Sequence, residues 1–243
     1  MSDSLIIIPT FNEKENIENI IRKVFSLERS FHILIVDDGS PDGTANIVKN
    51  LKTEFQDKLH IEERKGKLGL GTAYIHGFKW ALSKEYQFIF EMDADFSHNP
   101  DDLIRLYNEC NNNGADLSIG SRYVKGVNIV NWPMSRLLMS FFASKYVKLV
   151  TRMPINDATA GFKCYRRDVL ETINLNRIQF VGYAFQIEMK FKAWKYGFKI
   201  SEVPVIFTDR TEGTSKMSGG IFFEAVLGVL QMKIKSHFRK FSR

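Results

Sequence analysis

Residues 87–100 read QFIFEMDADFSHNP, and the interpretation of the whole chain begins from this stretch. The letters FIF at 88–90 form a short apolar run, as a buried central strand does. Asp93 and Asp95 follow at the point where that strand must end. Pro100 then opens an amphipathic run that indicates a helix. The acidic pair is therefore predicted on a loop between a strand and a helix.

Two carboxylates separated by a single residue repel each other unless a cation, a proton or water compensates their charge. A hard divalent cation is one such compensation, because Mg2+ and Mn2+ prefer oxygen ligands and take one or two protein carboxylates together with substrate phosphates. The alternative is an ordinary acidic surface loop. The position of Asp93 and Asp95 after a buried strand favours the metal site.

The composition is that of a folded globular protein. Apolar residues make up 44% and charged residues 26% of the 243 residues, enough for one large α/β domain or one domain with an appendage. The apolar run from Leu5 to Ile8 is too short for a signal peptide, and no stretch reaches the roughly 18–20 apolar residues of a membrane span. The spacing of Cys110 and Cys164 matches no disulfide framework or metal site, which suits a reducing compartment.

The positive charge is concentrated at the C-terminus. The chain carries a net charge of +6, and residues 231–243 contribute five cations and no acid, so the remainder carries only +1 (6 minus 5). This distribution favours a local anionic partner at the C-terminus over a body that wraps nucleic acid.

Apolar runs and helical patterns alternate along the first half of the chain, which is typical of a mostly parallel sheet with helices on both faces. One helix is predicted after a capping Asn12, and one strand is predicted to run unbroken over 200–207. The other predicted strands are Leu5 to Ile8, Ile33 to Val36, Leu59 to Glu63, 88–90 and Leu117 to Ile119.

Polar groups follow several of these strands. They are Pro9-Thr10, Asp37-Asp38, Asp93 to Asp95, and Arg122. Ligands of open α/β sheets collect beyond the carboxyl ends of the strands, so these four loops are expected to meet at one edge and form a site. The alternative is a set of unrelated turns at strand ends.

Three further features have open interpretations. The glycine loop 65–71 is either a flexible connection or a phosphate contact, and its spacing is not that of a dinucleotide-binding fingerprint. Glu188 lies in an apolar setting and is either a core carboxylate paired with a cation or a catalytic group. Arg210 and Lys216 flank a glycine in a loop that either closes over phosphates or is solvated.

Two segments have the composition of surface-associated helices. Residues 134–150 are apolar on most sides, so a helix there is either buried or lies against lipid. Residues 221–241 carry apolar side chains at steps of three and four between flanking lysines and arginines, which indicates a helix attracted to anionic lipid. Docking on another subunit or on RNA are the alternatives for this second helix. The stripe consists of Leu227, Leu230, Ile234, Phe238 and Phe241.

The chain resembles the polyprenyl-phosphate (dolichol-phosphate) mannosyltransferases, which are inverting members of glycosyltransferase family 2. The motifs that carry the resemblance extend over most of the chain: IPTFNEKEN at 8–16, VDDGSPDGT at 36–44, DADFSHNP at 93–100, GSRY at 120–123, NWP at 131–133, GFKCYRR at 161–167 and DRTEGTSK at 209–216. The first three recur in many sugar transferases, whereas their combination with the later ones is specific to lipid-phosphate acceptors. The resemblance implies an α/β A-type glycosyltransferase fold with C-terminal amphipathic interface helices.

The resemblance also implies roles for individual residues. Asp93, Asp95 and Arg122 would be catalytic, and Asp93, Asp95 and Ser97 would ligate Mg2+ or Mn2+, although Ser97 is shorter than the Gln of some relatives. The nucleotide sugar would contact Pro9, Phe11, Glu13, Val36, Asp38, Asp93, Ala94, Asp95, Arg122, Arg210 and Lys216. The acceptor phosphate would contact Arg122, Ser135, Arg136, Arg210 and Lys216.

The implied reaction is transfer of mannose from GDP-mannose to a polyprenyl phosphate, with inversion to a β-linked product. Residues 1–218 would form the glycosyltransferase domain, with a nucleotide-sugar half at 1–125 and an acceptor half at 126–218, and residues 219–243 would form a basic amphipathic helix. The enzyme is expected at the cytoplasmic face of a membrane, peripherally attached, without a nucleic acid partner. The alternatives are UDP-glucose or another nucleotide sugar as donor, or a membrane-bound subunit that binds a nucleotide sugar without catalysis.

Overall fold

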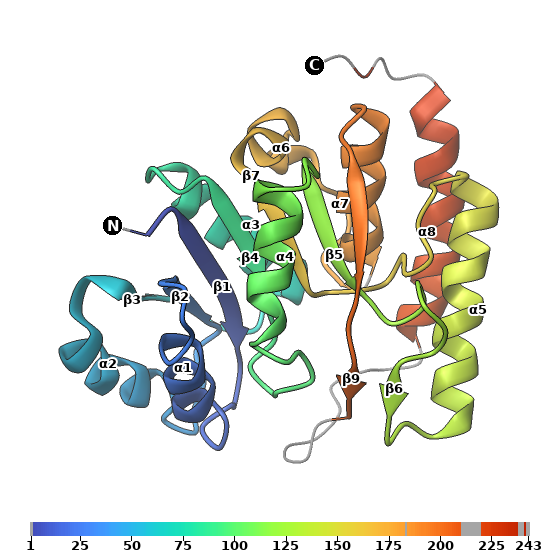
Figure 1. Ribbon diagram of the computed structural model, residues 1–243. Coiled ribbons are helices and arrows are strands. Elements are labelled where there is room, and N and C mark those ends of the chain that lie inside the picture. The colour runs from blue at the N-terminus through green and yellow to red at the C-terminus, as the bar shows by residue number, and fades with distance from the viewer. Residues whose placement is uncertain (1, 183, 210–219, 238–240, 242–243) are drawn as a thin grey trace.

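The computed structural model describes residues 2–182, 184–209, 220–237 and 241. Within these residues, helices alternate with strands along most of the chain (Figure 1). The strands are β1 (Ser4–Thr10), β2 (His32–Asp37), β3 (Leu59–Glu63), β4 (Phe88–Glu91), β5 (Leu117–Ser121), β6 (Ile129–Val130), β7 (Lys163–Arg166), β8 (Ile200–Pro204) and β9 (Phe207–Thr208). The helices are α1 (Ile17–Phe25), α2 (Thr44–Phe55), α3 (Leu70–Leu82), α4 (Asp102–Asn111), α5 (Met134–Thr151), α6 (Arg167–Thr172), α7 (Ala184–Lys195) and α8 (Gly220–His237), with short 3-10 turns at Gln56–Lys58 and Leu175–Arg177.

The central sheet has the strand order β3-β2-β1-β4-β7-β5-β8 in the described residues. The pairs among β1, β2, β3 and β4 are parallel, as is the pair of β5 with β8. The strand β7 is antiparallel to both β4 and β5, and β6 and β9 form a small separate parallel sheet. The predicted α/β architecture with a mostly parallel sheet is thereby confirmed.

Helices cover both faces of the sheet, as predicted. In β1, Leu5 and Ile7 belong to one apolar cluster, with the helices α3, α6 and α7, while Ile6 and Ile8 belong to a second cluster, with α1, α2 and α4. This alternation follows from the two-residue period of a strand. At Gly71 the backbone of α3 lies so close to Phe185 of α7 that an added Cβ would lie 2.8 Å from the ring.

Several predicted boundaries were wrong. The cap of α1 is Asn16, without a side-chain cap bond, whereas Asn12 lies in the preceding loop with a φ of 56°. The strand predicted over 200–207 is two strands, because the chain leaves the central sheet after Pro204 and pairs with β6 from Phe207. The last described helix ends at His237, and the ring of Phe241 lies against Tyr196, with a centroid distance of 5.1 Å. The terminal stripe therefore does not include Phe241, and Phe238 lies outside the described residues.

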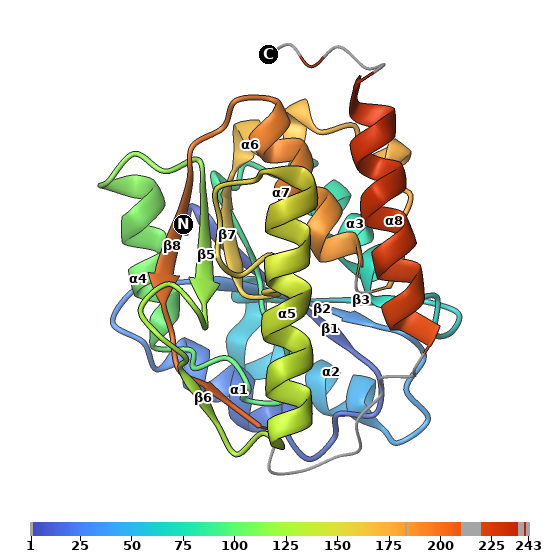
Figure 2. The ribbon, with the colours of Figure 1, turned by 90° about the vertical axis from the view of Figure 1, so that its right-hand side faces the viewer.

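The helices α5 and α8 lie at one side of the molecule (Figure 2), and their exposed side chains form an apolar surface there. The helices α5 and α8 lie side by side, joined by a hydrogen bond from the Tyr146 hydroxyl to the Val226 carbonyl at 3.0 Å. Most apolar side chains of α5 are exposed, which excludes the buried alternative for this segment. The exposed apolar side chains of the pair are Met134, Leu138, Met139, Phe142 and Leu149 of α5 and Leu227, Leu230 and Ile234 of α8.

Candidate active site

The loops that follow the parallel strands meet at one edge of the sheet, at the lower side of Figure 1. The antiparallel strand β7 begins at this same edge, because Lys163 pairs with both Glu91 and Ile119. The loop before β7 therefore joins the loops that end β4 and β5. Since the sequence showed no strand at 163–166, this contribution to the site was not predicted.

The acids that follow β2 have different environments. Asp37 is buried and accepts hydrogen bonds from the Thr10 hydroxyl at 2.8 Å and from the Ser40 hydroxyl and backbone N–H at 2.6 and 2.8 Å. The carboxylate of Asp38 is paired with Arg64, whose Nε lies 2.7 Å from Oδ1. Asp37 thus connects the end of β1 with the loop after β2. Asp38 forms an ion pair with Arg64, a residue that the sequence analysis did not single out.

The other residues predicted to bind the nucleotide sugar lie at or beneath this edge. Pro9 is half-buried at the end of β1, and Phe11 is half-buried with the Lys67 ammonium 5.2 Å from its ring centroid. The backbone N–H of Glu13 donates to the Thr44 hydroxyl at 3.0 Å. The side chain of Val36 is fully buried in the core, and Ala94 is 4% exposed.

The acid pair lies on a loop held by its own side chains. The backbone N–H of Asp93 donates to His98 Nδ1 at 3.1 Å, and the backbone N–H of Ser97 donates to Asp95 Oδ1 at 3.1 Å. The Asp93 side chain is 39% exposed, whereas Asp95 is buried. The Tyr74 hydroxyl donates to Asp93 Oδ1 at 3.4 Å, and burial, followed by the charge of Asp93, raises the pKa of this phenol well above its usual value. His98 is therefore a loop-forming residue that sequence reasoning missed.

The donor set at this loop is compatible with a hard divalent cation. No cluster of three or more His, Cys, Asp or Glu side chains with the geometry of a metal site occurs among the described residues. Two carboxylates are nevertheless enough for Mg2+ or Mn2+ when substrate phosphates and water complete the coordination. Ser97 is buried beside them and is 4% exposed.

Arg122, directly after β5, is buried and forms a two-point ion pair. Its Nε and Nη2 donate to the two oxygens of Asp157 at 2.7 and 2.6 Å, and Nη2 also donates to the Thr159 hydroxyl at 2.8 Å. Burial alone would raise the pKa of Asp157, but the charge and hydrogen bonds of Arg122 outweigh burial and hold that pKa below its usual value. Both partners come from the loop before β7, which the sequence analysis did not connect with Arg122.

Two guanidinium groups lie close to the indole of Trp132. The Cζ of Arg136 lies 4.1 Å and that of Arg122 5.6 Å from ring centroids of Trp132. Arg136 is paired with Asp209, with Nη1 to Oδ1 at 2.8 Å. The indole Nε1 is buried and has no hydrogen-bond partner among the described residues, and such an orphaned donor is rare unless a ligand satisfies it.

Aromatic contacts connect the loop that carries Asp93 and Asp95, called the acid loop below, with Arg122 and Arg136. The ring of His98 lies 5.6 Å from that of Phe207, and Phe207 lies 5.2 Å from Trp132. The structure therefore brings Asp93, Asp95, Arg122 and Arg136 to the same edge of the sheet. Ser135 is exposed at the start of α5. Arg210 and Lys216 lie outside the described residues.

Glu188, for which two roles were open, has the contacts of a core carboxylate. It is paired with Lys192 at 2.7 Å and accepts hydrogen bonds from the backbone N–H groups of Gln179 and Phe180 at 2.9 and 3.1 Å. These contacts agree with the structural interpretation of this side chain.

A family model described as glycosyl transferase family 2 matches residues 5–173. The chain belongs to this family. The match includes the acid loop, Arg122 and the loop before β7, so the geometry described above lies within the family domain.

Two curated proteins resemble the chain over nearly its full length. Polyprenol monophosphomannose synthase of Mycolicibacterium smegmatis is 45% identical over 232 residues, which are 96% of this chain and 87% of the relative. Undecaprenyl-phosphate mannosyltransferase of Micrococcus luteus is 43% identical over 225 residues, which are 93% of this chain and 91% of the relative.

Solved structures with low sequence identity share the fold. Glucosyl-3-phosphoglycerate synthase from Mycobacterium tuberculosis, in complex with Mn2+, uridine diphosphate and glucosyl-3-phosphoglycerate, has a TM-score of 0.67 at 15% identity and covers 95% of this chain and 79% of that chain. A mannosyltransferase from Pyrobaculum calidifontis, in complex with GDP-mannose and Mn2+, has a TM-score of 0.61 at 15% identity and covers 98% of this chain and 64% of that chain. The predicted A-type glycosyltransferase fold is thereby confirmed.

Proposed function

We propose that this protein transfers mannose from GDP-mannose to a polyprenyl phosphate with inversion of the anomeric centre. The observation that carries the proposal is the meeting of the acid loop with Arg122, Arg136 and Trp132 at one edge of the sheet. The names of the two curated relatives support a mannosyl donor and a polyprenyl phosphate acceptor. The complex of the fold neighbour with GDP-mannose supports this donor for the fold.

In this proposal the chain has a donor half at 1–125, an acceptor half at 126–218 and a C-terminal helix at 219–243. The donor contacts are Pro9, Phe11, Glu13, Val36, Asp38, Asp93, Ala94, Asp95, Arg122, Arg210 and Lys216, and the acceptor-phosphate contacts are Arg122, Ser135, Arg136, Arg210 and Lys216. The loops after β1, β2 and β4 belong to the first half and those around α5 and β9 to the second.

A bound Mg2+ or Mn2+, held by Asp93 and Asp95 with Ser97 beside them, would offset negative charge on the departing nucleoside diphosphate. The fold neighbours crystallised with Mn2+ support a divalent ion for this fold. The exposed carboxylate of Asp93 is accessible to a substrate, and the Ser97 N–H contact orients the carboxylate of Asp95.

The acceptor requires positioning more than activation. A phosphate monoester has a second pKa of about 6 and is largely a dianion near neutral pH, so it is already nucleophilic. Arg136, which is half-buried and paired with Asp209, can exchange this carboxylate for the acceptor phosphate. Arg122 is held in one orientation by Asp157 and Thr159, which fixes the positive wall of the acceptor site.

We place the reaction at the cytoplasmic face of a membrane, with the protein attached peripherally. Among the described residues, no helix is both long enough and apolar enough to cross a bilayer. The exposed apolar side chains of α5 and α8 form a surface that suits the boundary between headgroups and acyl chains. The helix α5 of this surface belongs to the proposed acceptor half, where a lipid substrate must enter.

The test is release of GDP by purified protein given GDP-mannose, a short-chain polyprenyl phosphate and Mg2+ or Mn2+. Release that needs the acceptor, and that Asp95→Ala abolishes while the fold is retained, supports the proposal. A panel that includes UDP-glucose identifies the donor. A protein that binds a nucleotide sugar but never turns it over would instead be the non-catalytic subunit.

A further inference from the structure

The strand β8 carries a half-buried carboxylate, Glu202, that the proposed site does not include. Because β8 lies beside β5 in the sheet, with Glu202 opposite Ile119, this carboxylate lies close to the point where β5 ends (Figure 2). The hydroxyl of Ser121, the last residue of β5, donates to Glu202 Oε1 at 2.7 Å. Glu202 is therefore hydrogen-bonded to the residue that directly precedes Arg122.

The same carboxylate also holds the loop before β7. The backbone N–H and the side-chain Nδ2 of Asn156 donate to Glu202 Oε2 at 2.8 and 2.9 Å, and the backbone N–H of Asp157 donates to Oε1 at 2.9 Å. Together with the Ser121 hydroxyl, these groups give the carboxylate four hydrogen bonds from two separate segments of the chain. Glu202 thus joins the end of β5 to the loop that carries Asp157.

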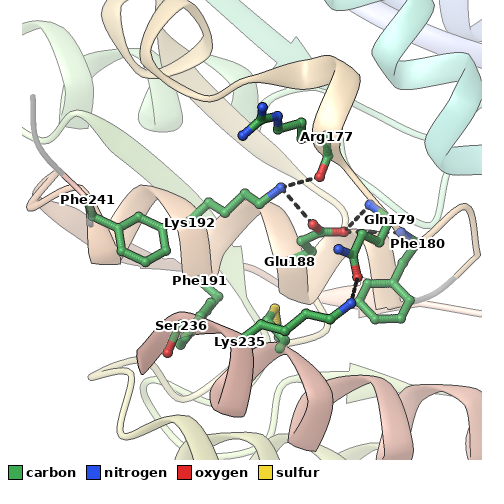
Figure 3. Close-up of a pocket in the computed structure, with 10 residues that line it drawn as sticks. Arg177, Gln179, Phe180, Glu188, Phe191, Lys192, Lys235, Ser236 and Phe241 are labelled. Atoms are coloured by element: carbon green, nitrogen blue, oxygen red, sulfur yellow. Dashed lines mark hydrogen bonds and ion pairs between the residues drawn. The ribbon is translucent and has the colours of Figure 1, made fainter. Parts of the chain in front are cut away.

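All four donors are neutral, and Glu202 forms no ion pair within the described part of the chain. The buried Glu188 shows a different arrangement, since it is paired with Lys192 in addition to two backbone N–H groups (Figure 3). A carboxylate accepts hydrogen bonds at both oxygens, whereas a glutamine side chain of the same shape accepts at only one. Position 202 therefore requires an acid because of its donors, and not because of a cation.

Asp157 connects Glu202 with Arg122. The backbone of Asp157 is held by Glu202, and its carboxylate accepts hydrogen bonds from the backbone N–H and the Nε of Arg122 at 2.9 and 2.7 Å. Arg122 and Asp157 are both buried, and Nη2 of Arg122 also donates to Thr159 of the same loop. A displaced loop would move the carboxylate that orients the guanidinium, and a misplacement of about 1 Å can cost about 100-fold in rate.

We propose that Glu202 is a positioning residue of the transferase site: it fixes residues 156–159 against the end of β5 and thereby holds Arg122 in the orientation that binds the acceptor phosphate. The role in transfer rests on the function proposed above, whereas the orientation of Arg122 by Glu202 does not depend on which reaction the protein catalyses. Glu202 acts through Asp157 and not on a substrate.

The neighbouring position of β8 offers a matched control. Ser201 lies on the opposite face of the strand, and its hydroxyl donates to Glu109 of α4 at 2.6 Å. The Nδ2 of Asn113 also donates to Glu109, at 2.8 Å, as the Nδ2 of Asn156 does to Glu202. The variants E109Q and N113A therefore change the same kinds of bonds as E202Q and N156A, at a carboxylate that has no hydrogen bond to the described residues of the loop before β7.

The first measurement is the exchange of the Arg122 Nε–H with solvent, followed by heteronuclear NMR, with R122K used to assign the resonance. This group is buried and donates to Asp157 at 2.7 Å, so its exchange should be slow in the wild type. We expect exchange to be about 10-fold faster in E202Q and about threefold faster in N156A, with less than about a twofold change in E109Q and N113A. Unchanged exchange in folded E202Q, or equal acceleration in E109Q, would overturn the proposal. If E202Q does not fold, the comparison of N156A with N113A decides.

The second measurement is kcat/KM for a short-chain polyprenyl phosphate in detergent, with GDP-mannose at saturation. E202Q is expected to lower this value about 10- to 100-fold, while E109Q stays within about twofold of the wild type even if its melting temperature falls. Faster exchange in E202Q with unchanged kcat/KM would overturn the role of Glu202 in transfer. Lack of transfer by the wild type would count against the proposed function alone, because the exchange measurement needs no turnover and still decides whether Glu202 orients Arg122.

Discussion

Arg122 is held in place by a residue that the motifs did not single out. Asp157 binds both nitrogens on one side of this guanidinium, and both residues are buried. Asp157→Asn leaves a buried arginine without its counter-charge, so we expect a loss of about 3–5 kcal/mol in the free energy of unfolding. Urea denaturation measures this loss. Thr159→Val is a milder control at about 1.5–3 kcal/mol, because it removes the hydrogen bonds of the Thr159 hydroxyl with Arg122 and Asp157 but keeps the ion pair.

The contribution of Asp157 also has a predicted pH dependence. Its pKa is lower in the folded protein than its usual value of about 3.9, so the unfolded state binds the proton more readily. The stabilisation is complete above that usual value and is lost as the pH falls through the lower folded pKa. The difference in unfolding free energy between wild type and Asp157→Asn should therefore shrink below about pH 4, and a difference that stays constant there would contradict the assignment.

Trp132 provides a test of the acceptor site at a single atom. Trp132→Phe keeps an aromatic ring beside Arg122 and Arg136 but removes the buried Nε1–H, which has no partner in the described part of the chain. If this donor binds an acceptor phosphate oxygen, kcat/KM for the lipid phosphate should fall about 10-fold or more, while the melting temperature stays the same or rises. A lower melting temperature with unchanged kcat/KM would give Trp132 a purely structural role.

At the level of residues, the sequence predicted the parts of the site that follow strands and missed those that other side chains position. Asp93 and Asp95 were found because their carboxylates interrupt an apolar run. Asp157 and His98 were missed because their roles depend on partners 35 and 5 residues away, which no local spacing reveals. Arg64 was missed for the same reason, since its partner Asp38 lies 26 residues away.

At the level of elements, β7 is the main feature that sequence reasoning did not find. Its four residues, KCYR, contain two cations, and a short strand with buried charges has no apolar pattern to reveal it. The charge is tolerated because Lys163 is paired with Glu91 at 2.9 Å, with both side chains fully buried. The short strand β9 was likewise merged with β8, because the two residues between them do not interrupt the hydrophobic pattern.

Leu227, Leu230 and Ile234 of the predicted stripe are exposed on α8, whereas Phe241 does not belong to it. The exposure of the stripe leads to a further prediction. Leu227 is 67% and Ile234 61% exposed, so Leu227→Ser with Ile234→Ser should leave the melting temperature nearly unchanged. Each apolar side chain that enters a bilayer contributes about 1.5–3 kcal/mol, so binding to lipid vesicles should weaken at least about 100-fold. Leu68→Ser is the control, because Leu68 is 60% exposed on a loop outside α5 and α8.

The outcome of this comparison separates the alternatives that the sequence left open for the C-terminal helix. Vesicle binding that survives the double substitution would exclude this stripe as the membrane contact. RNA binding that depends steeply on salt, with no vesicle binding, would favour a nucleic acid partner. A change of oligomeric state would favour a second subunit on the stripe.

For the whole molecule, the sequence predicted the sheet and the edge at which the site forms, because strand order and handedness constrain where the loops of a parallel sheet meet. It did not predict how the two halves are joined. That junction consists of long-range contacts, such as the hydrogen bond from Gly71 N–H to the Val181 carbonyl at 2.8 Å, and of buried charges, namely the pair of Lys163 in β7 with Glu91 in β4 and Lys190 of α7. Neither kind of contact has a periodic signal.

One of these buried charges should make the stability of the whole protein depend on alkaline pH. Lys190 is fully buried, and its ammonium donates to the Ala160 carbonyl at 2.6 Å, on the loop that also carries Asp157. Burial, followed by the positive charge of Lys163, lowers the pKa of Lys190 well below its usual value, although Asp157 and Glu91 oppose the shift. The folded protein therefore releases this proton at a lower pH than the unfolded chain.

Between the two pKa values the unfolded chain binds more protons, so the contribution of Lys190 makes the free energy of unfolding rise with pH until about 10.4, the usual pKa of lysine. Lys190→Met keeps the length of the side chain and removes its titration, so the rise between pH 7 and pH 9.5 should be smaller in this variant. The midpoints of urea denaturation at the two pH values measure this rise in stability. Lys79→Met is the control, because Lys79 is exposed on α3 and its variant should show the same rise as the wild type. If the wild type and Lys190→Met change in parallel, the buried ammonium does not control this dependence.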